Sequence, residues 1–377
     1  MQIRPVLILF TTLFIVMVGF GVIFPIMPFF VTEMGATPFH FGLLLASYSL
    51  MQFIFSPVWG SLSDRMGRKP VILVGLLGFS VTFVLFGLSN NLLTLFISRI
   101  AGGILSSACL PSAMAYMADI TSEEDRGAGM GMMGAAMGLG MIVGPAIGGL
   151  FSAWHFSTPF FLSAGLAALN FIFAALFLKE SKRQHDRSEI KYDRFKHLFS
   201  LRGYIAFIFF LVFIVSFSMS GYEGTFSLYA KERLGYGAYD MGIVFTFMGI
   251  VGVIVQGALI GWMIKKLGEE MVIKIGLFIS ALGYGLIILA RDLWSLIFFV
   301  CLAVIGQGFL RPSLASLISK DTEYEQGATM GAMQSVDSLG RIAGPLVGSL
   351  LFQLGANLPY LGTGGINVVV LLAFLFF

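Results

Sequence analysis

Charge is scarce in this sequence of 377 residues, since Asp, Glu, Lys and Arg together make up only 11% of it, against roughly 25% in soluble domains. The net charge of +3 is spread over short connections and gives no basic stripe for nucleic acid. Only two cysteines are present, Cys109 and Cys301, and both lie in apolar runs without metal-ligand neighbours. A disulfide framework or a metal site is therefore not expected.

Apolar residues make up 57% of the chain, and the mean hydropathy is +0.91. These values are typical of an integral membrane protein, in which each spanning helix needs about 20 mostly apolar residues. Twelve such segments are predicted, at 5–30, 39–60, 70–88, 93–117, 128–152, 159–178, 202–230, 238–264, 271–290, 293–318, 327–353 and 358–377. The first segment is too long and too proline-rich for a cleaved signal peptide. The last segment ends at Phe377 without a polar tail, so we expect that the chain is trimmed or incomplete there.

The distribution of Lys and Arg predicts the orientation. Most of them lie in alternate connections, while the opposite connections hold only Lys231, Arg233 and Arg291. The positive-inside rule places both termini in the cytoplasm. The longest polar stretch then predicts three parts, an N-terminal six-helix bundle at 1–178, a cytoplasmic linker at 179–201 and a C-terminal six-helix bundle at 202–377.

The two halves repeat each other. "GSLSDRMG" at 60–67 corresponds to "GWMIKKLG" at 261–268, and "GPAIGG" at 144–149 corresponds to "GPLVGS" at 344–349. Pro111 and Pro312 keep nearly the same spacing. This duplication predicts an all-α membrane protein with 12 transmembrane helices in two pseudo-symmetric six-helix bundles, which carries a solute between the bundles by alternating access.

A charged motif occupies the connection between the second and third segments. "GSLSDRMGRK" has the order G-x-x-x-D-R-x-G-R-K and resembles the signature of the major facilitator superfamily. Gly60 is expected to let two helices approach closely, and Asp64 to meet cations or the dipole at a helix end. Simple topology-setting charge would explain the basic residues but not the spacing of the others. The resemblance implies a conformational latch that favours the outward-facing state, formed by Gly60, Asp64, Arg65, Gly67, Arg68 and Lys69.

A second motif, "GLGMIVGPAIGG" at 138–149, resembles the fifth-span motif of drug:proton antiporters. "GFGVIFPIMP" and "SRIAGG" resemble motifs of their first and fourth spans. The chain is similar over nearly its whole length to the NorA/Bmr-type multidrug exporters of Gram-positive bacteria. Prolines and glycines in these motifs are expected to bend the helices and permit close packing; they are Gly140, Gly144, Pro145, Gly148, Gly149, Gly344 and Pro345.

Charged side chains at membrane depth cost about 2.5–3.5 kcal/mol each on insertion scales, so each one needs a reason. Glu223 has no basic residue within seven positions. It is either a helix-end carboxylate near the outer surface or, as the resemblance implies, a group that couples protons and binds cationic drugs. Asp337 and Arg341 lie one helical turn apart and are able to pair, with either a structural or a coupling role. Arg311 is a candidate partner for Glu223 or Asp337. Arg99 is either a snorkelling side chain or, by the resemblance, part of the proton path.

The chain departs from the NorA type in the tenth span, where Gln307 replaces a second acid. That replacement argues against a two-acid coupling scheme. Neutral polar residues and aromatic residues are predicted to line the substrate cavity, although a lone amide often only bridges two helices. They are Gln52, Asn170, Gln256, Gln307, Gln334, Phe20, Tyr222 and Phe226.

The predicted function is proton-coupled efflux of lipophilic, often cationic drugs. A sugar or metabolite exporter and a glycolipid flippase are the alternatives on the same fold. An enzyme is not expected because no reacting constellation or ATP-binding motif is present. The proton gradient is the expected energy source, with no cofactor and no metal. The expected setting is a bacterial cell membrane, where the protein acts as a monomer in contact with lipid, protons and small-molecule substrates.

Overall fold

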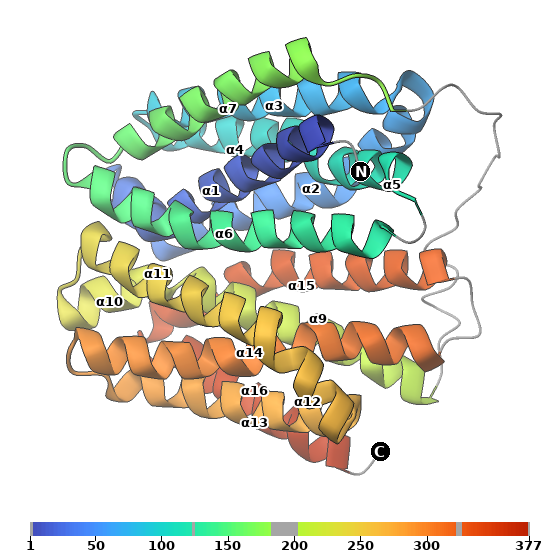
Figure 1. The fold of residues 1–377 in the computed structure, drawn as a ribbon. Helices are drawn as coiled ribbons and strands as arrows, with labels where there is room; N and C mark the ends of the chain where they lie inside the picture. The colour runs from blue at the N-terminus through green and yellow to red at the C-terminus, as the bar shows by residue number, and fades with distance from the viewer. Residues whose placement is uncertain (1–2, 123–124, 182–202, 322–325, 376–377) are drawn as a thin grey trace. The chain divides into compact units, whose positions relative to one another are not determined.

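A computed structural model describes residues 3–122, 125–181, 203–321 and 326–375. All regular secondary structure in these ranges is helical (Figure 1). The first seven helices are α1 (Ile3–Glu33), α2 (Pro38–Met66), α3 (Arg68–Gly87), α4 (Leu92–Ser106), α5 (Cys109–Ile120), α6 (Arg126–Ser152) and α7 (Thr158–Phe177). The later helices are α9 (Gly203–Glu223), α10 (Phe226–Leu234), α11 (Ala238–Ile254), α12 (Ile260–Leu267), α13 (Glu269–Leu286), α14 (Leu293–Asp321), α15 (Gln326–Leu354) and α16 (Leu358–Leu375).

Within the described residues, eleven helical stretches are long and apolar enough to cross a membrane. The twelfth expected span corresponds to α15, a helix of 29 residues that is not among the eleven. Asp337, Arg341 and several small residues lower the hydropathy of α15. A helix of this composition is expected where protein, rather than lipid, surrounds most of it.

Three expected spans are interrupted. The fourth is divided into α4 and α5, the seventh into α9 and α10 at Gly224–Thr225, and the eighth contains a π-helical turn at Val255–Leu259 between α11 and α12. Backbone irregularity at membrane depth is tolerated where protein or a water-filled path surrounds it. The length of an apolar run therefore predicts which segments span the membrane, but it does not predict where their helices are interrupted.

The chain divides into two compact units. Unit 1 comprises Met1–Thr37, Ser47–Arg187 and Gly237–Thr246, and unit 2 comprises Pro38–Ala46, Ser188–Tyr236 and Phe247–Phe377. Most of the predicted linker at 179–201 lies outside the described residues, so the predicted domain boundaries stay a prediction.

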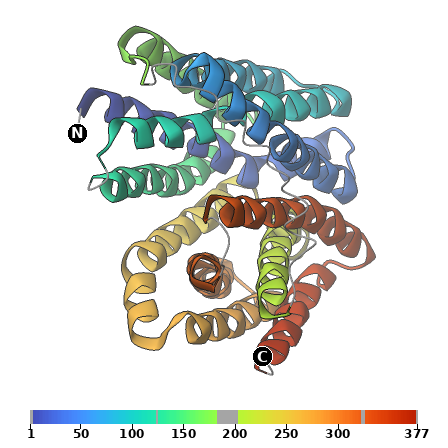
Figure 2. The same cartoon turned by 90° about the vertical axis from the view of Figure 1, so that its right-hand side faces the viewer.

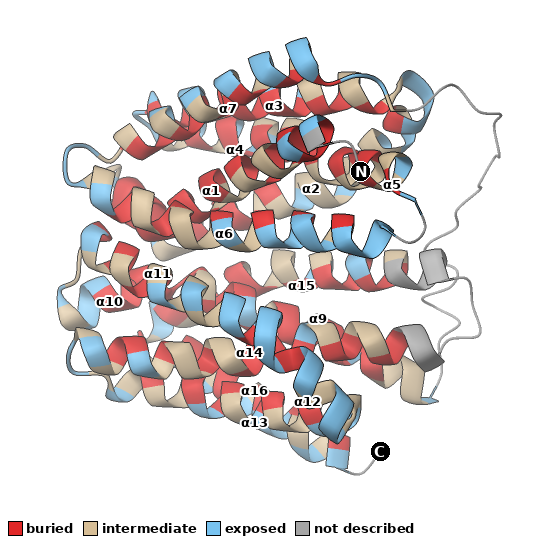
Figure 3. Cartoon of the chain, in the orientation of Figure 1, coloured by how far each residue is buried: buried red, intermediate tan, exposed pale blue. Residues whose placement is uncertain are grey.

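Each unit has its own apolar core. In unit 1, residues such as Leu13, Phe79 and Met117 join α1, α3, α5, α6 and α7. In unit 2, residues such as Leu277 and Leu310 join α9, α13, α14, α15 and α16. Figure 2 shows α14 nearly end-on, among the other helices of this core. Figure 3 shows that the buried positions follow the helix faces turned toward neighbouring helices.

Glycines make the same contact in both units. A Cβ atom built on Gly140 or Gly144 of α6 would lie 2.6 Å from the Phe14 oxygen or 2.5 Å from the Val18 oxygen of α1. In unit 2, a Cβ on Gly340 of α15 would lie 2.7 Å from the Phe213 oxygen of α9. Because backbone atoms cannot move aside cheaply, only glycine fits these crossings. Gly60 differs from the expectation, since nothing lies within 4 Å of a Cβ built there.

Candidate functional site

An ion pair joins two helices of unit 2. Nη2 of Arg311 on α14 donates to Oδ2 of Asp337 on α15 at 2.8 Å. The Asp337 side chain is only 5% exposed, whereas that of Arg311 is 54% exposed. Ser216 of α9 also donates to Asp337, at 2.5 Å, and Gln334 does so at 3.3 Å.

This network confirms Arg311 as a partner of Asp337 and differs from the other expected pairing, with Arg341 one turn later. The carboxylate instead joins three helices, α9, α14 and α15, through Ser216 and Arg311. The Arg311 guanidinium donates to one oxygen of the Asp337 carboxylate, and the Ser216 hydroxyl donates to the other. A charge-assisted hydrogen bond of this kind is stronger than a neutral one. Asp337 is thus a neutralised, fully engaged carboxylate.

Glu223 is the other acid of this region. It is the last residue of α9, immediately before the break at Gly224–Thr225, and it is partly buried. No hydrogen bond or ion pair involves its side chain within the described part of unit 2. Arg341 and Arg311 are the basic residues that act on its charge from a longer distance. Glu223 is therefore the carboxyl group left available for a proton or a cation.

An aromatic cluster lies beside Glu223. The Tyr222 ring is 4.8 Å from that of Phe226 and 5.3 Å from that of Tyr284, measured between centroids. Phe226 is 0% exposed, so it packs in the cluster and does not line an open cavity, contrary to the expectation. Gln307 is 9% exposed, and it lies close enough to Tyr284 to interact. Neither polar atom of its amide has a hydrogen-bond partner of good geometry among the described residues.

The other predicted amides occupy different surroundings. Asn170 of α7 is buried and hydrogen-bonds Thr11 and Thr12 of α1, so it bridges two helices. Gln256 is exposed and lies in the π-helical turn, an irregularity that is frequent at functional sites. Gln52 of α2 is partly exposed.

Arg99 of α4 is a buried cation of unit 1. It is 4% exposed, and its guanidinium lies 4.5 Å from the centroid of the Tyr48 ring. Its Nε has no hydrogen-bond partner in the described residues. This deep burial corrects the idea of a shallow, snorkelling side chain. Phe20, another predicted cavity residue, lies 6.2 Å from Tyr48 between ring centroids.

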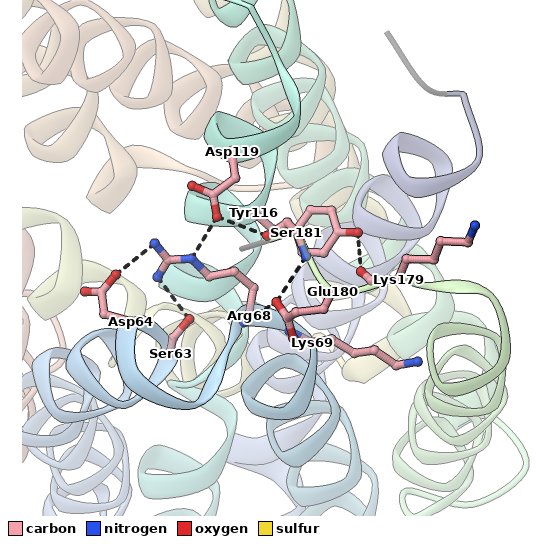
Figure 4. Close-up of polar contacts among 9 residues, drawn as sticks. All are labelled: Ser63, Asp64, Arg68, Lys69, Tyr116, Asp119, Lys179, Glu180 and Ser181. Carbon is pink, nitrogen blue, oxygen red and sulfur yellow. Dashed lines mark hydrogen bonds and ion pairs between the residues drawn. The ribbon is translucent and has the colours of Figure 1, made fainter. Parts of the chain in front are cut away.

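The predicted latch forms a polar cluster in unit 1 (Figure 4). Arg68, the first residue of α3, pairs with Asp64 at 2.8 Å and with Asp119 at 3.1 Å, and its Nη1 donates to Ser63 at 3.1 Å. The cluster thereby connects the end of α2 and the start of α3 to the end of α5. Arg65 lies in the last turn of α2, and Lys69 donates to the Ala175 carbonyl of α7 at 2.8 Å.

Glu180, which follows α7, closes the N-terminus of α3. Its carboxylate accepts the backbone N–H groups of Arg68 at 2.8 Å and Lys69 at 3.2 Å, where the helix dipole favours negative charge. Gly67 permits this approach, because its φ of +102° suits glycine and a Cβ there would lie 2.5 Å from the Glu180 carboxylate. Ser181 in turn donates to Asp119 at 3.0 Å.

Sequence reasoning missed Asp119 and Glu180 as members of this cluster. Both are charged residues at the ends of apolar segments, which is the signal that could have found them. Their roles depend on the packing of α5 and α7 beside α3, which no motif in the sequence specifies. Within the described residues, no group of three or more His, Cys, Asp or Glu side chains could hold a metal ion.

Comparison with known proteins gives the family. The model of the Major Facilitator Superfamily matches residues 9–345 and, in a second match, 258–377. Multidrug resistance protein 1 of Bacillus subtilis is 34% identical over 355 residues, covering 94% of this chain and 91% of that protein. Quinolone resistance protein NorA of Staphylococcus aureus strain COL is 29% identical over 364 residues, covering 96% and 93%.

Solved structures agree in fold. The nucleoside transporter NupG superposes with a TM-score of 0.81 at 14% identity, over 99% of this chain and 98% of that one. The human organic anion transporter MFSD10 gives a TM-score of 0.73 at 24% identity, over 98% of this chain and 99% of that one. At these identities the likeness concerns the fold alone. The sequence matches, together with the helical architecture and the Gly60–Lys69 motif, show that this chain belongs to the Major Facilitator Superfamily.

Proposed function

We propose that this protein exports lipophilic, often cationic small molecules across the bacterial cell membrane in exchange for protons, by alternating access. Its similarity to multidrug resistance proteins and to NorA over more than nine-tenths of the chain supports drugs as the substrate class. The protein acts as a transporter and not as an enzyme, works as a monomer with both termini in the cytoplasm, and needs no cofactor besides the proton gradient.

The observation that carries the proposal is the difference between the two acids of unit 2. Asp337 is neutralised by Arg311 and holds two further hydrogen bonds, whereas Glu223 has neither an ion pair nor a hydrogen bond in the described residues. An engaged carboxylate has little capacity to exchange ligands. An unengaged one, partly buried beside aromatic rings, is suited to bind either a proton or an organic cation.

Exchange follows from competition for Glu223. On the outer side a proton adds to its carboxylate, the charge is lost, and a bound cation is released. The neutral side chain costs less to carry through the return to the inward state. On the inner side, an entering cation is favoured by the ionised carboxylate, so proton loss and substrate binding occur together. Asp337 and Arg311, together with Ser216, keep α9, α14 and α15 in contact during the cycle.

Proton release on addition of ethidium to purified protein in weakly buffered detergent tests this mechanism. Wild type is expected to release protons in proportion to bound ethidium, and Glu223→Gln to release none because it has no proton to lose. Glu232→Gln is the matched control, since Glu232 is an exposed acid on the neighbouring helix α10. Unchanged release from Glu223→Gln with normal binding would move the coupling to another residue. Failure of wild type to bind ethidium would remove lipophilic cations as substrates.

A further inference from the structure

A concave site lies at one end of unit 1. A cavity of about 630 Å³ is bordered by the connections that follow α1, α3 and α6, and its lining includes Phe30, Glu33, Asn90, His155 and Phe161. Gly87 ends α3 beside this cavity, whereas Arg68 begins α3 in the polar cluster of Figure 4. The two sites therefore lie at opposite ends of a helix about 30 Å long. With the basic cluster on the cytoplasmic side, the cavity opens outward.

The hydrogen-bond donors around the cavity are largely occupied. The N-terminus of α7 could otherwise attract an anion. However, the N–H of Ser157 binds Nδ1 of His155 at 3.1 Å, and the N–H of Thr158 binds the His155 carbonyl at 3.0 Å. Pro159 has no N–H, and the next two amides bind the Ser157 carbonyl.

Negative groups remain available. Glu33 lines the cavity and has no hydrogen bond or ion pair within the described part of the chain. It is the last residue of α1, and Gly87 is the last residue of α3, so two helix C-termini meet the cavity. Most of the last carbonyl groups there already accept hydrogen bonds, such as those of Val31 and Phe86, so Glu33 is the main negative group. Among the described residues that line the cavity there is no Lys or Arg.

Aromatic rings complete the lining. Phe30 is buried and packs against Phe86 and Phe160, with ring centroids 6.1 and 5.9 Å away, so its position is fixed. Phe161 is 40% exposed beside Gly87. Phenyl faces next to a carboxylate are the surroundings that attract organic ammonium groups, through the ring quadrupole and direct charge.

From this arrangement we propose that the outward end of unit 1 is a binding site for the ammonium group of an organic cation, separate from the region of Glu223. Glu33 supplies the charge, and Phe30 and Phe161 supply the rings. The same chemistry occurs in a free lipophilic cation and in the amine headgroup of a membrane lipid. The site goes beyond the exchange mechanism, which does not require it.

Fluorescence of Trp154 offers a local test, because this residue is 78% exposed and precedes His155. A variant with Trp59→Phe, Trp262→Phe and Trp294→Phe leaves Trp154 as the only tryptophan. N-methylpyridinium, a cationic quencher, is titrated against the purified protein in detergent, with neutral acrylamide as the reference. The proposal expects a saturable quenching component for N-methylpyridinium and purely linear quenching for acrylamide.

Substitutions separate the site from nonspecific attraction. Glu33→Gln is expected to weaken the binding of N-methylpyridinium about fivefold, because one partly solvated charge is lost. Phe161→Leu keeps the apolar volume but removes the aromatic ring, and it is also expected to weaken this binding. Glu232→Gln and Glu223→Gln are expected to leave it unchanged. Linear quenching in the parent variant, or equal saturation in Glu33→Gln, would overturn the proposal, whatever the result of the ethidium experiment.

Nanodiscs identify the natural source of the cation. If phosphatidylethanolamine suppresses the saturable component relative to phosphatidylglycerol alone, the site holds a lipid amine headgroup. If both lipids leave the component intact, the site is open to free cations on the outer side. Either outcome keeps the ammonium chemistry, and both require that Glu33→Gln weaken the saturable component.

Discussion

The ion pair between Arg311 and Asp337 predicts an asymmetric response to substitution. Arg311→Gln leaves the Asp337 carboxylate, 5% exposed, with only Ser216 and Gln334 as donors among the described residues. Breaking a buried pair in this way costs about 3–5 kcal/mol. Asp337→Asn instead leaves Arg311, whose side chain is 54% exposed and which we expect to be hydrated. That loss is expected to cost about 1 kcal/mol, the value of an exposed pair.

Thermal unfolding of the purified variants in one detergent measures the asymmetry. Arg311→Gln is expected to lower the melting temperature clearly more than Asp337→Asn. The double variant Arg311→Gln with Asp337→Asn is expected to recover most of the loss, because it no longer contains a buried carboxylate.

The opposite order would refute this reasoning. If Asp337→Asn were the more damaging change, the exposed part of Arg311 would contact lipid and not water, because a guanidinium without its counter-ion is costly only in an apolar setting. A double variant no more stable than Arg311→Gln would show that the pair matters through helix packing instead of charge.

Two further predictions follow from the contacts in each unit. Gly344→Ala is expected to lower the melting temperature, because its Cβ would lie 2.8 Å from the Gly221 backbone nitrogen. Gly60→Ala and Gly365→Ala are the controls and are expected to be tolerated, because nothing lies within 4 Å of a Cβ at either position. Equal effects of all three substitutions would contradict the close crossing of α9 and α15. Glu180→Ala is expected to lower the free energy of unfolding by about 1 kcal/mol, because it removes the cap of α3. Glu180→Gln keeps a hydrogen-bond acceptor and is expected to lower it less. If thermal unfolding showed a larger loss for Glu180→Gln than for Glu180→Ala, the charge of Glu180 would matter more than its hydrogen bonds.

Much of this fold could be predicted from the sequence because the membrane allows few alternatives. Backbone groups in lipid must bond within a helix, so each apolar run of sufficient length indicates one span. The repeated Gly-Pro stretches at 144–145 and 344–345 similarly indicate duplicated helix crossings, and the packing of Gly144 against α1 and of Gly344 against α9 follows that pattern.

The sequence offers both Arg341 and Arg311 as partners for Asp337, but it could not decide between them. Asp337 and Arg341 satisfy a one-turn rule, yet Asp337 uses Arg311 from another helix, because helix rotation and the position of Ser216 decide which donor reaches it. The break after Glu223 was missed for a related reason. Hydropathy does not record where neighbouring helices allow the backbone to leave helical geometry.

The comparison of the two units shows which features the duplication retained. Their glycine crossings correspond, since Gly140 and Gly144 contact α1 as Gly340 and Gly344 contact α9. Any larger residue at these crossings would meet backbone atoms, and this steric requirement keeps the packing alike in both units.

Their interior charges do not correspond. Unit 1 holds Arg99 over the ring of Tyr48, with no acidic partner in the described residues, whereas unit 2 holds Glu223 without a basic partner in contact. A charge at membrane depth is costly and contributes nothing to helix crossing, so no packing requirement retains it. The two units therefore share one scaffold but differ in the sign of the charge that each leaves uncompensated. That difference is where we expect the specificity of this transporter to lie.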